Sequence, residues 1–250
     1  MALHSFSRSE LLIGTEGLDK LKKSKVAVFG IGGVGTFTVE ALARTGVGSF
    51  VLIDDDDICL TNINRQIHAT RSTVGKAKVE VMKDRILDIN PKAKVTVFKE
   101  LYTSESAERI LDDSYDYVVD AIDMVTSKID LVVRCKEKSL PIISSMGAGN
   151  KLDPTKFEVS DIYNTTICPL AKVLRKELRK RNVTDLKVVY SKEKPIVPHT
   201  IKSDCKTDCI CTNKERTCTV RHQIPGSVAF VPSVVGLILA SVVVRDLISK

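Results

Sequence analysis

Several common signatures are missing from this 250-residue sequence. It has no Gly-x-x-x-x-Gly-Lys-Ser/Thr segment, which excludes a P-loop ATPase. It has no paired Cys-x-x-Cys segments of the kind that bind structural zinc. Residues 1–8 contain no basic segment followed by an apolar run, so we expect no secretory leader. There is also no internal repeat and no low-complexity tract.

Composition is that of an ordinary globular protein, with 43% apolar and 28% charged residues, and the length suits one domain or one and a half. The chain has 7 cysteines and no expected leader, which indicates reduced thiols and a cytoplasmic location. The net charge is +7, and residues 171–222 carry 14 Lys or Arg against 6 Asp or Glu. This block indicates a polyanionic partner, although a solvated helix face and a charged loop would look the same.

Short apolar runs alternate with amphipathic segments over residues 1–150, which predicts an α/β fold with a Rossmann-like, mostly parallel sheet. The expected strands cover residues 25–29, 49–53, 94–98, 115–120 and 141–145. The expected helices cover residues 34–45, 72 or 73 to 90, 104–111 and 127–138. Ligands of such sheets bind beyond the carboxyl ends of the strands, where the strand order reverses.

The alternation stops after residue 150. Residues 151–222 are expected to hold a basic helix, 170–181, and a cysteine-rich loop, 204–221. Residues 223–250 are expected to return to the core as a buried strand, 228–231, and an apolar helix capped by Ser233. Residues 228–244 carry no charge, so membrane contact is the alternative to a core role, but Pro232 and Gly236 interrupt the run.

A glycine turn joins the first strand to the first helix and contains Gly30, Gly32, Gly33 and Gly35. Glycines let the backbone approach a phosphate, and the following helix presents free N–H groups there. Asp54 ends the second strand, where a carboxylate accepts hydrogen bonds from ribose hydroxyls. The glycine turn alone is a weak signal, and a loop aspartate is the alternative for Asp54.

Polar residues after the second strand favour ATP over a dinucleotide: Asp56, Asn62, Arg65, Gln66 and Lys78. Arg65 and Lys78 would stabilise the charge of departing pyrophosphate. Asn62 and Gln66 suit hydrogen bonding to phosphates or to a substrate carboxylate. Individually, Arg65 and Lys78 could be ordinary surface side chains.

Two aspartates follow the fourth strand. Asp123 should face the glycine turn, where its carboxylate could hold Mg²⁺ between phosphates. Asp120 is the competing candidate, but we expect it to be buried at the end of the strand.

The cysteines have no single interpretation. Four lie within 14 residues, with a spacing that fits neither a zinc ribbon nor a ferredoxin: Cys205, Cys209, Cys211 and Cys218. They could bind a metal or be reduced loop thiols. Cys168 is a weaker nucleophile candidate, and Cys59 and Cys135 are expected to be core residues.

These motifs together resemble the ubiquitin-activating-like adenylating superfamily (ThiF/MoeB/HesA), along essentially the whole chain. The resemblance is carried by residues 6–14, the glycine turn, Asp54, residues 62–66, Lys78 and Asp123. Residues 65–69, 168–172 and 225–232 look most like the tRNA threonylcarbamoyladenosine dehydratases. The resemblance implies one ThiF-type domain over residues 1–250, with residues 1–150 as its nucleotide-binding part.

The resemblance also implies roles for individual residues. Asp54 would hold the ribose and Asn62, Arg65 and Lys78 the phosphates of ATP, while Asp123 would position Mg²⁺. In this superfamily the arginine equivalent to Arg65 often reaches into a neighbouring subunit, which implies a homodimer, and Arg8 could do likewise.

The implied reaction is an ATP-driven cyclisation of threonylcarbamoyladenosine in tRNA. Its carboxylate is adenylated with release of pyrophosphate, and a carbamoyl nitrogen then closes the ring with release of AMP. The basic block would bind the tRNA backbone.

Three other functions compete with this interpretation: activation of a ubiquitin-like sulfur carrier in molybdopterin or thiamine synthesis, an NAD-dependent oxidoreductase, and a non-catalytic tRNA-binding module. No thioester cysteine stands in an established context. This favours direct cyclisation, although Cys168, Cys211 or Cys218 could form a covalent intermediate.

Overall fold

A computed structural model describes residues 3–199 and 225–249. They form a seven-stranded sheet in the order β3-β2-β1-β4-β5-β7-β6. The strands are β1 (Lys25–Phe29), β2 (Ser49–Ile53), β3 (Lys94–Phe98), β4 (Tyr117–Asp120), β5 (Ile142–Ser145), β6 (Phe157–Asp161) and β7 (Lys187–Ser191). Among these strands, only β6 runs antiparallel to its neighbour, β7. The predicted mostly parallel α/β fold is therefore confirmed.

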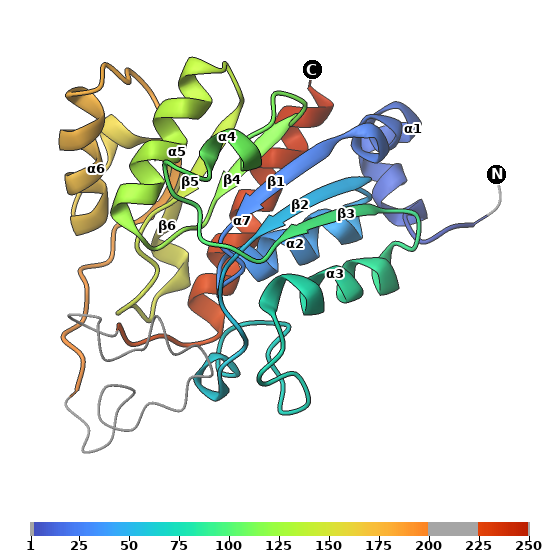
Figure 1. The fold of residues 1–250 in the computed structure, drawn as a ribbon, viewed down its shortest axis with the longest axis horizontal. Coiled ribbons are helices and arrows are strands. Elements are labelled where there is room, and N and C mark those ends of the chain that lie inside the picture. Colours follow the sequence, from blue (N-terminus) through green and yellow to red (C-terminus); the bar gives the residue numbers. More distant parts are fainter. Residues whose placement is uncertain (1–2, 200–224, 250) are drawn as a thin grey trace.

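Helices cover both faces of the sheet (Figure 1). One face packs against α1 (Ser7–Lys23), α2 (Gly35–Thr45), α3 (Lys78–Ile89) and α7 (Phe230–Ile248). The other packs against α4 (Ala107–Ile110), α5 (Val125–Glu137) and α6 (Pro169–Arg179). Short 3-10 turns lie at Leu60–Asn62, Pro154–Lys156 and Ile162–Asn164.

The central strands are apolar on both faces because helices cover both. In β1, Val26 and Val28 pack toward one layer of helices, whereas Ala27 and Phe29 pack toward the other. Strands that are buried in this way read as continuous apolar runs, which is why sequence alone locates them. All five strands predicted in the first 150 residues are present.

The largest error in the first 150 residues concerns the start of α3. This helix begins at Lys78 and not at Ser72 or Thr73. Residues 58–76 instead form a loop closed by two backbone hydrogen bonds, from Ile58 to Lys76 and from Gly75 to Ile58, each of 2.8 Å. Gly75 has a φ of 86°, a conformation that glycine adopts readily and that ends any helical path here.

The sequence analysis missed two strands, β6 and β7. It expected the alternation of strands and helices to stop at residue 150, but the alternation continues beyond it. β7 pairs with β5, so the segment after residue 150 belongs to the same sheet as the nucleotide-binding part. β6 is half-exposed at the edge and alternates apolar and polar residues, which gives a weaker pattern than a central strand.

The predicted strand at residues 228–231 is wrong. Helix α7 begins at Phe230 and contains Ser233, which therefore does not cap it. Pro232 fits the first turn because the missing N–H has no helical acceptor there. Within the described ranges α7 is the one helix long and apolar enough to span a membrane, and half of it is buried. Its Gly236 carbonyl accepts a hydrogen bond from Thr38 of α2 at 3.2 Å, as expected for a core helix.

Candidate nucleotide-binding and catalytic site

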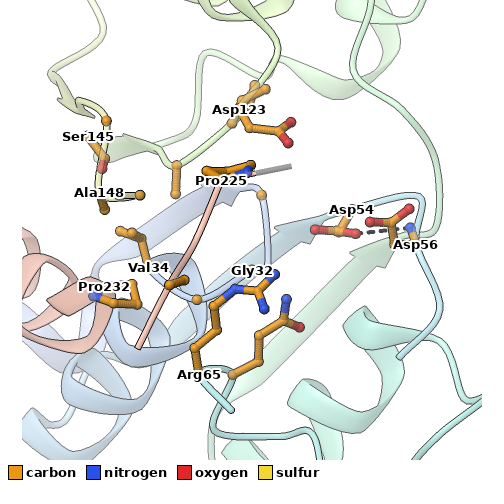
Figure 2. Close-up of a pocket in the computed structure, with 18 of the residues that line it drawn as sticks. Gly32, Val34, Asp54, Asp56, Arg65, Asp123, Ser145, Ala148, Pro225 and Pro232 are labelled. Carbon is orange, nitrogen blue, oxygen red and sulfur yellow. Dashed lines mark hydrogen bonds between the residues drawn. The ribbon is translucent and has the colours of Figure 1, made fainter. Parts of the chain in front are cut away.

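A cavity of about 810 Å³ opens beyond the carboxyl ends of the strands. The strand order reverses between β1 and β4, so the loops after these strands line opposite walls. Figure 2 shows Arg65 and Asp123 approaching the cavity from opposite sides, with Gly32 between them and Asp54 at one end.

The glycine turn packs as tightly as its sequence requires. Gly30 has a φ of 91°, and a Cβ at this position would lie 2.6 Å from the Ala121 carbonyl oxygen. A Cβ at Gly35 would lie 1.8 Å from the Gly30 carbonyl oxygen. Larger residues are therefore excluded by backbone atoms, and the loops after β1 and β4 touch as predicted.

The Asp54 carboxylate holds the glycine turn in place by a hydrogen bond to its backbone. Its Oδ2 accepts the Ile31 N–H at 2.7 Å, and its Oδ1 accepts the Asp56 N–H at 2.9 Å. Only 10% of the side chain is exposed. Asp54 therefore combines its position at the end of β2 with a structural role that the sequence did not indicate.

Lys78, the first residue of α3, is buried and paired with acids. Its Nζ lies 2.7 Å from Asp56 Oδ2 and 3.4 Å from Asp54 Oδ1. Burial alone would lower the pKa of Lys78, but the two carboxylates outweigh it and raise the pKa, so the ammonium stays charged. This ammonium lines the cavity, within reach of any phosphate that replaces one carboxylate as its partner.

The loop after β2 brings three further predicted residues to the cavity. Asn62 is 9% exposed, and its Oδ1 accepts the Cys59 N–H at 3.0 Å, which shapes the loop. Arg65 donates from Nη1 to the Thr61 carbonyl and to Asn64 Oδ1, each at 2.9 Å. Gln66 is 5% exposed, and its Oε1 has no hydrogen-bond partner in the described part of the chain. This oxygen is therefore a buried acceptor without a donor, on a residue that lines the cavity.

The loop after β4 separates the two candidate aspartates. Asp123 is exposed and lines the cavity. Asp120 is fully buried and pairs with Lys128, with 2.7 Å between Oδ2 and Nζ. The predicted burial of Asp120 is therefore confirmed, and Asp123 is the carboxylate that a ligand can reach.

Magnesium fits Asp123 better than the other acids of the site. Asp54, Asp55 and Asp56 offer oxygens within 4.8 Å of one another, but two of these carboxylates, Asp54 and Asp56, already pair with the Lys78 ammonium. Mg²⁺ in nucleotide sites usually takes one or two carboxylates together with phosphate oxygens and water. Asp123, whose carboxylate is open to the cavity, meets that requirement.

The end of the cavity away from the loop after β2 is lined by residues that the sequence analysis did not identify. The loop after β5, residues 145–151, forms this wall together with the start of α6. Its glycines lie at the carboxyl edge of the sheet, and that position was the available signal. Buried Cys168 precedes α6 and lines the same wall.

The other cysteines divide between core, cavity and undescribed residues. Cys135 is fully buried as predicted, and burial raises the pKa of its thiol to about 12. Cys59 is half-buried and lines the cavity, so its predicted core position is wrong. The four clustered cysteines, Cys205, Cys209, Cys211 and Cys218, lie outside the described residues.

The basic helix is α6, and several of its charges have partners within the protein. Arg175 donates to the Thr165 carbonyl at 2.9 Å and is half-buried. Arg179 stacks over the Tyr163 ring, with 5.0 Å to the centroid, and Lys180 pairs with Glu177. Lys172 and Lys176 are exposed and are the most available cations of the helix.

A glycine turn at a helix N-terminus, an acid after β2 and an Arg–Lys–Asp set across a switch point define an adenylating enzyme of α/β architecture. The chain belongs to the ThiF family, which matches residues 6–250. It is 50% identical over 247 residues to the tRNA threonylcarbamoyladenosine dehydratase of Bacillus subtilis, which covers 98% of this chain and 95% of the relative.

Other relatives support the same grouping. The Escherichia coli tRNA threonylcarbamoyladenosine dehydratase is 44% identical over 174 residues, covering 70% of this chain and 65% of that protein. Crystal structures of the E. coli enzyme in complex with AMP and with ATP each superpose with a TM-score of 0.85, covering 98% of this chain and 94% of that chain. The E. coli sulfur carrier protein ThiS adenylyltransferase is 34% identical over 151 residues, 59% of this chain and 60% of that protein.

Proposed function

We propose that this protein is an ATP-dependent tRNA threonylcarbamoyladenosine dehydratase. One observation carries the proposal: similarity to the B. subtilis dehydratase extends over 98% of this chain, at 50% identity. Similarity to the sulfur-carrier enzyme extends over 59% of the chain. ATP as co-substrate is further supported by the ATP complex of a structurally similar dehydratase.

The reaction has two chemical steps. In the first, an oxygen of the threonyl carboxylate attacks the α-phosphorus of ATP, and pyrophosphate leaves. In the second, a carbamoyl nitrogen attacks the activated acyl carbon and loses its proton, and AMP leaves with the former carboxylate oxygen. The net change in the nucleoside is the loss of one water. The protein lowers both barriers by fixing the reactants and by stabilising negative charge.

The residues of the cavity have distinct roles in this proposal. Asp54 accepts hydrogen bonds from the ribose, and the N–H groups of the glycine turn cradle phosphate oxygens. Arg65 and Lys78 neutralise the departing pyrophosphate. Gln66 and Asn62 lie beside them, and Gln66 has the free acceptor. Lys78 exchanges part of its pairing with Asp56 for a phosphate when ATP binds.

Magnesium is proposed as the cofactor, with Asp123 as its protein ligand. Mg²⁺ draws charge from phosphate oxygens and so makes the α-phosphorus more open to attack. Asp123 stands at the wall opposite Arg65 (Figure 2), which supports a triphosphate bound between the carboxylate and the guanidinium.

The macromolecular partner is proposed to be tRNA, bound in part by the exposed lysines of α6. This helix begins at Pro169, directly after Cys168 at the cavity wall. A nucleic acid backbone following Lys172 and Lys176 would therefore lead toward the site. We propose that the reaction takes place in the cytoplasm, where cysteines stay reduced.

A homodimer is proposed from the N-terminal helix. Leu11 and Leu12 of α1 are 86% and 89% exposed, which is costly for adjacent leucines unless another surface covers them. Arg8 lies one turn earlier, is exposed and does not line the cavity of its own chain, whereas Arg65 does. Light scattering on Leu12→Asp tests this arrangement: an unchanged mass would contradict a dimer formed through α1.

Mass spectrometry of nucleosides tests the function directly. The protein is incubated with tRNA bearing threonylcarbamoyladenosine, ATP and Mg²⁺, and the expected result is an ATP-dependent loss of one water from that nucleoside. An unchanged nucleoside, together with ATP–pyrophosphate exchange driven by a sulfur-carrier protein, would overturn the proposal in favour of sulfur-carrier activation.

A further inference from the structure

Lys151 is a buried cation in the cavity wall that the proposed mechanism has not used. It follows β5 in the loop at the far end of the cavity and is only 4% exposed. Its Nζ donates one hydrogen bond, to the Glu193 main-chain carbonyl at 2.7 Å. An ammonium has three donors, so this neutral acceptor leaves most of its capacity unused.

No acid neutralises Lys151 within the described residues. The nearest candidate, Glu193, directs its carboxylate elsewhere: Oε1 accepts the Leu152 N–H and Oε2 the Asp153 N–H, each at 3.0 Å. No carboxylate oxygen from residues 3–199 or 225–249 lies within 4.0 Å of Lys151 Nζ. Burial accordingly lowers the pKa of Lys151, although Cys168 and Glu193 oppose the shift. A buried ammonium in this situation gains free energy when an anion binds beside it.

The backbone holds Lys151 in place from two sides. Asn150, the preceding residue, has a φ of 57° and exchanges two hydrogen bonds with Gly226, of 2.7 Å and 2.8 Å. Its carbonyl accepts the Ile196 N–H at 2.8 Å. Contacts with two remote segments thus fix the position of the Lys151 main chain. A side chain that binds a ligand in a defined geometry needs such a rigidly held backbone.

The position of Lys151 matches the reacting end of the substrate. Displacement at phosphorus is in line, so the attacking carboxylate lies on the side of the α-phosphate opposite to the pyrophosphate. The proposed pyrophosphate site is formed by Arg65 and Lys78, after β2. Strand β5 is the neighbour of β4 on the other side of the sheet's switch point, so its loop lies toward the attacking side.

We propose that the Lys151 ammonium binds the carboxylate of the acyl substrate and holds it for attack on the α-phosphate. The inference deepens the proposed function and depends on it. It assigns substrate selectivity to Lys151, because a neutral group in place of the carboxylate would leave the buried charge without a counter-ion. Lys151 is thereby separated from Arg65 and Lys78, which act on the nucleotide.

The test compares two RNA stem-loops, one bearing threonylcarbamoyladenosine and the other its carboxamide, in which the carboxylate is a neutral amide. Affinities are measured with a non-hydrolysable ATP analogue present. The wild-type protein should prefer the acid. Lys151→Gln should lose about tenfold to hundredfold in affinity for the acid, little for the amide, and none for the ATP analogue. Lys151→Arg, which keeps the charge, should retain a preference for the acid.

Lys92→Gln is the matched control, because Lys92 is exposed at the amino end of β3, on the opposite edge of the sheet. It should leave both affinities unchanged. The proposal is overturned if Lys151→Gln keeps the wild-type preference for the acid. It is also overturned if this variant binds both RNAs normally and instead loses turnover in a pH-dependent way, which would make Lys151 a proton acceptor.

A measurement on the unmutated protein covers the case in which Lys151→Gln does not fold. In protein labelled at the lysine side chains, NMR titration should show the acid stem-loop raising the pKa of Lys151 and the amide leaving it unchanged. Equal effects of the two RNAs would exclude the inference. Wild-type turnover, measured in parallel, tests the proposed function separately, since a protein that dehydrates the acid without these responses refutes only the role of Lys151.

Discussion

Lys128 of α5 and Asp120 of β4 form an ion pair of 2.7 Å in which both side chains are fully buried. Lys128 Nζ also donates to Ser144 Oγ at 3.0 Å and to the Ser145 carbonyl at 2.9 Å. Asp120 Oδ1 accepts the Ile122 N–H at 3.1 Å. One ammonium thus ties the end of β4, which leads to Asp123, to the end of β5, which leads to Lys151.

Replacing Lys128 by methionine should destabilise the protein strongly. The change leaves Asp120 buried without a counter-ion, and removal of one partner of a buried pair costs about 3–5 kcal/mol. Urea denaturation measures the free energy of unfolding. Asp120→Asn added to Lys128→Met removes the stranded charge and should recover part of the loss, so a double variant less stable than the single one would contradict this account.

Arg65→Ala should leave a folded protein that is almost inactive. The guanidinium lines the cavity and donates to Thr61 and Asn64 of its own loop. Its removal should therefore mainly weaken stabilisation of the charge on the departing pyrophosphate. Loss of one preorganised charge-stabilising group costs about 10²–10³ in kcat. Steady-state kinetics and thermal melting check this. Arg71→Ala is the control, because Arg71 is exposed and does not line the cavity, and it should retain full activity.

Asp123→Asn should weaken the dependence on Mg²⁺. The carboxylate is exposed to the cavity, so its neutralisation leaves the fold intact and removes a hard anionic ligand. The Mg²⁺ concentration for half-maximal turnover should rise, and turnover should fall even at saturating Mg²⁺. A Mg²⁺ titration identical to that of the wild-type protein would assign the metal to other ligands.

His68 should make the protein less stable in mild acid. Burial, reinforced by the nearby Lys78 charge and opposed by the backbone of Ile31, lowers its pKa from 6.5 to about 3. By hydrogen-bond geometry neither ring nitrogen has a partner in the described part of the chain. Between these two pKa values His68 is protonated in the unfolded state and neutral in the folded state. Stability is therefore lost as the pH falls from about 6.5 toward about 3.

Between pH 7 and pH 5 this histidine should account for about 2 kcal/mol of lost unfolding free energy, at about 1.4 kcal/mol per pKa unit. His68→Leu should reduce the loss by that amount in urea titrations at the two pH values. His199→Leu, at an exposed position, is the control and should leave the pH dependence unchanged. An equal slope in both variants would mean that His68 is already paired.

The exposed lysines of α6 should contribute to tRNA affinity through the phosphates. Lys172→Ala and Lys176→Ala should each lower the salt slope of tRNA binding by about one. Filter binding over a salt series measures this. Lys22→Ala on α1, a surface lysine paired with Asp19, is the control. Arg175 should not be replaced in this experiment. Its side chain donates to the Thr165 carbonyl, so its replacement would disturb the local fold as well as any contact with tRNA. Unchanged slopes would place the tRNA surface elsewhere.

Sequence reasoning located the central strands and most of the nucleotide site because both follow from local rules. Glycines at positions 30 and 35 are required by backbone contacts, and Asp54 is required by its place at the end of a strand. The polar loop was found by residue type, but its course was not: the helix predicted from residue 72 or 73 is a closed loop up to Lys78. The conformation of such a loop is set by hydrogen bonds between residues that are far apart in the sequence. The periodicity of apolar residues carries no information about these bonds.

By itself the sequence determined the alternating architecture, the glycine turn and the family to which the chain belongs, since each depends on residue patterns within short segments. The sequence also predicted which of the two aspartates is buried, but only the tertiary structure showed that Lys128 is the partner of buried Asp120. The tertiary structure also decided that Lys78 rests between two acids and that Lys151 has none within ion-pair distance among the described residues. The physical reason is that burial and charge pairing depend on which remote groups the fold brings together, and those determine what a titratable side chain can do.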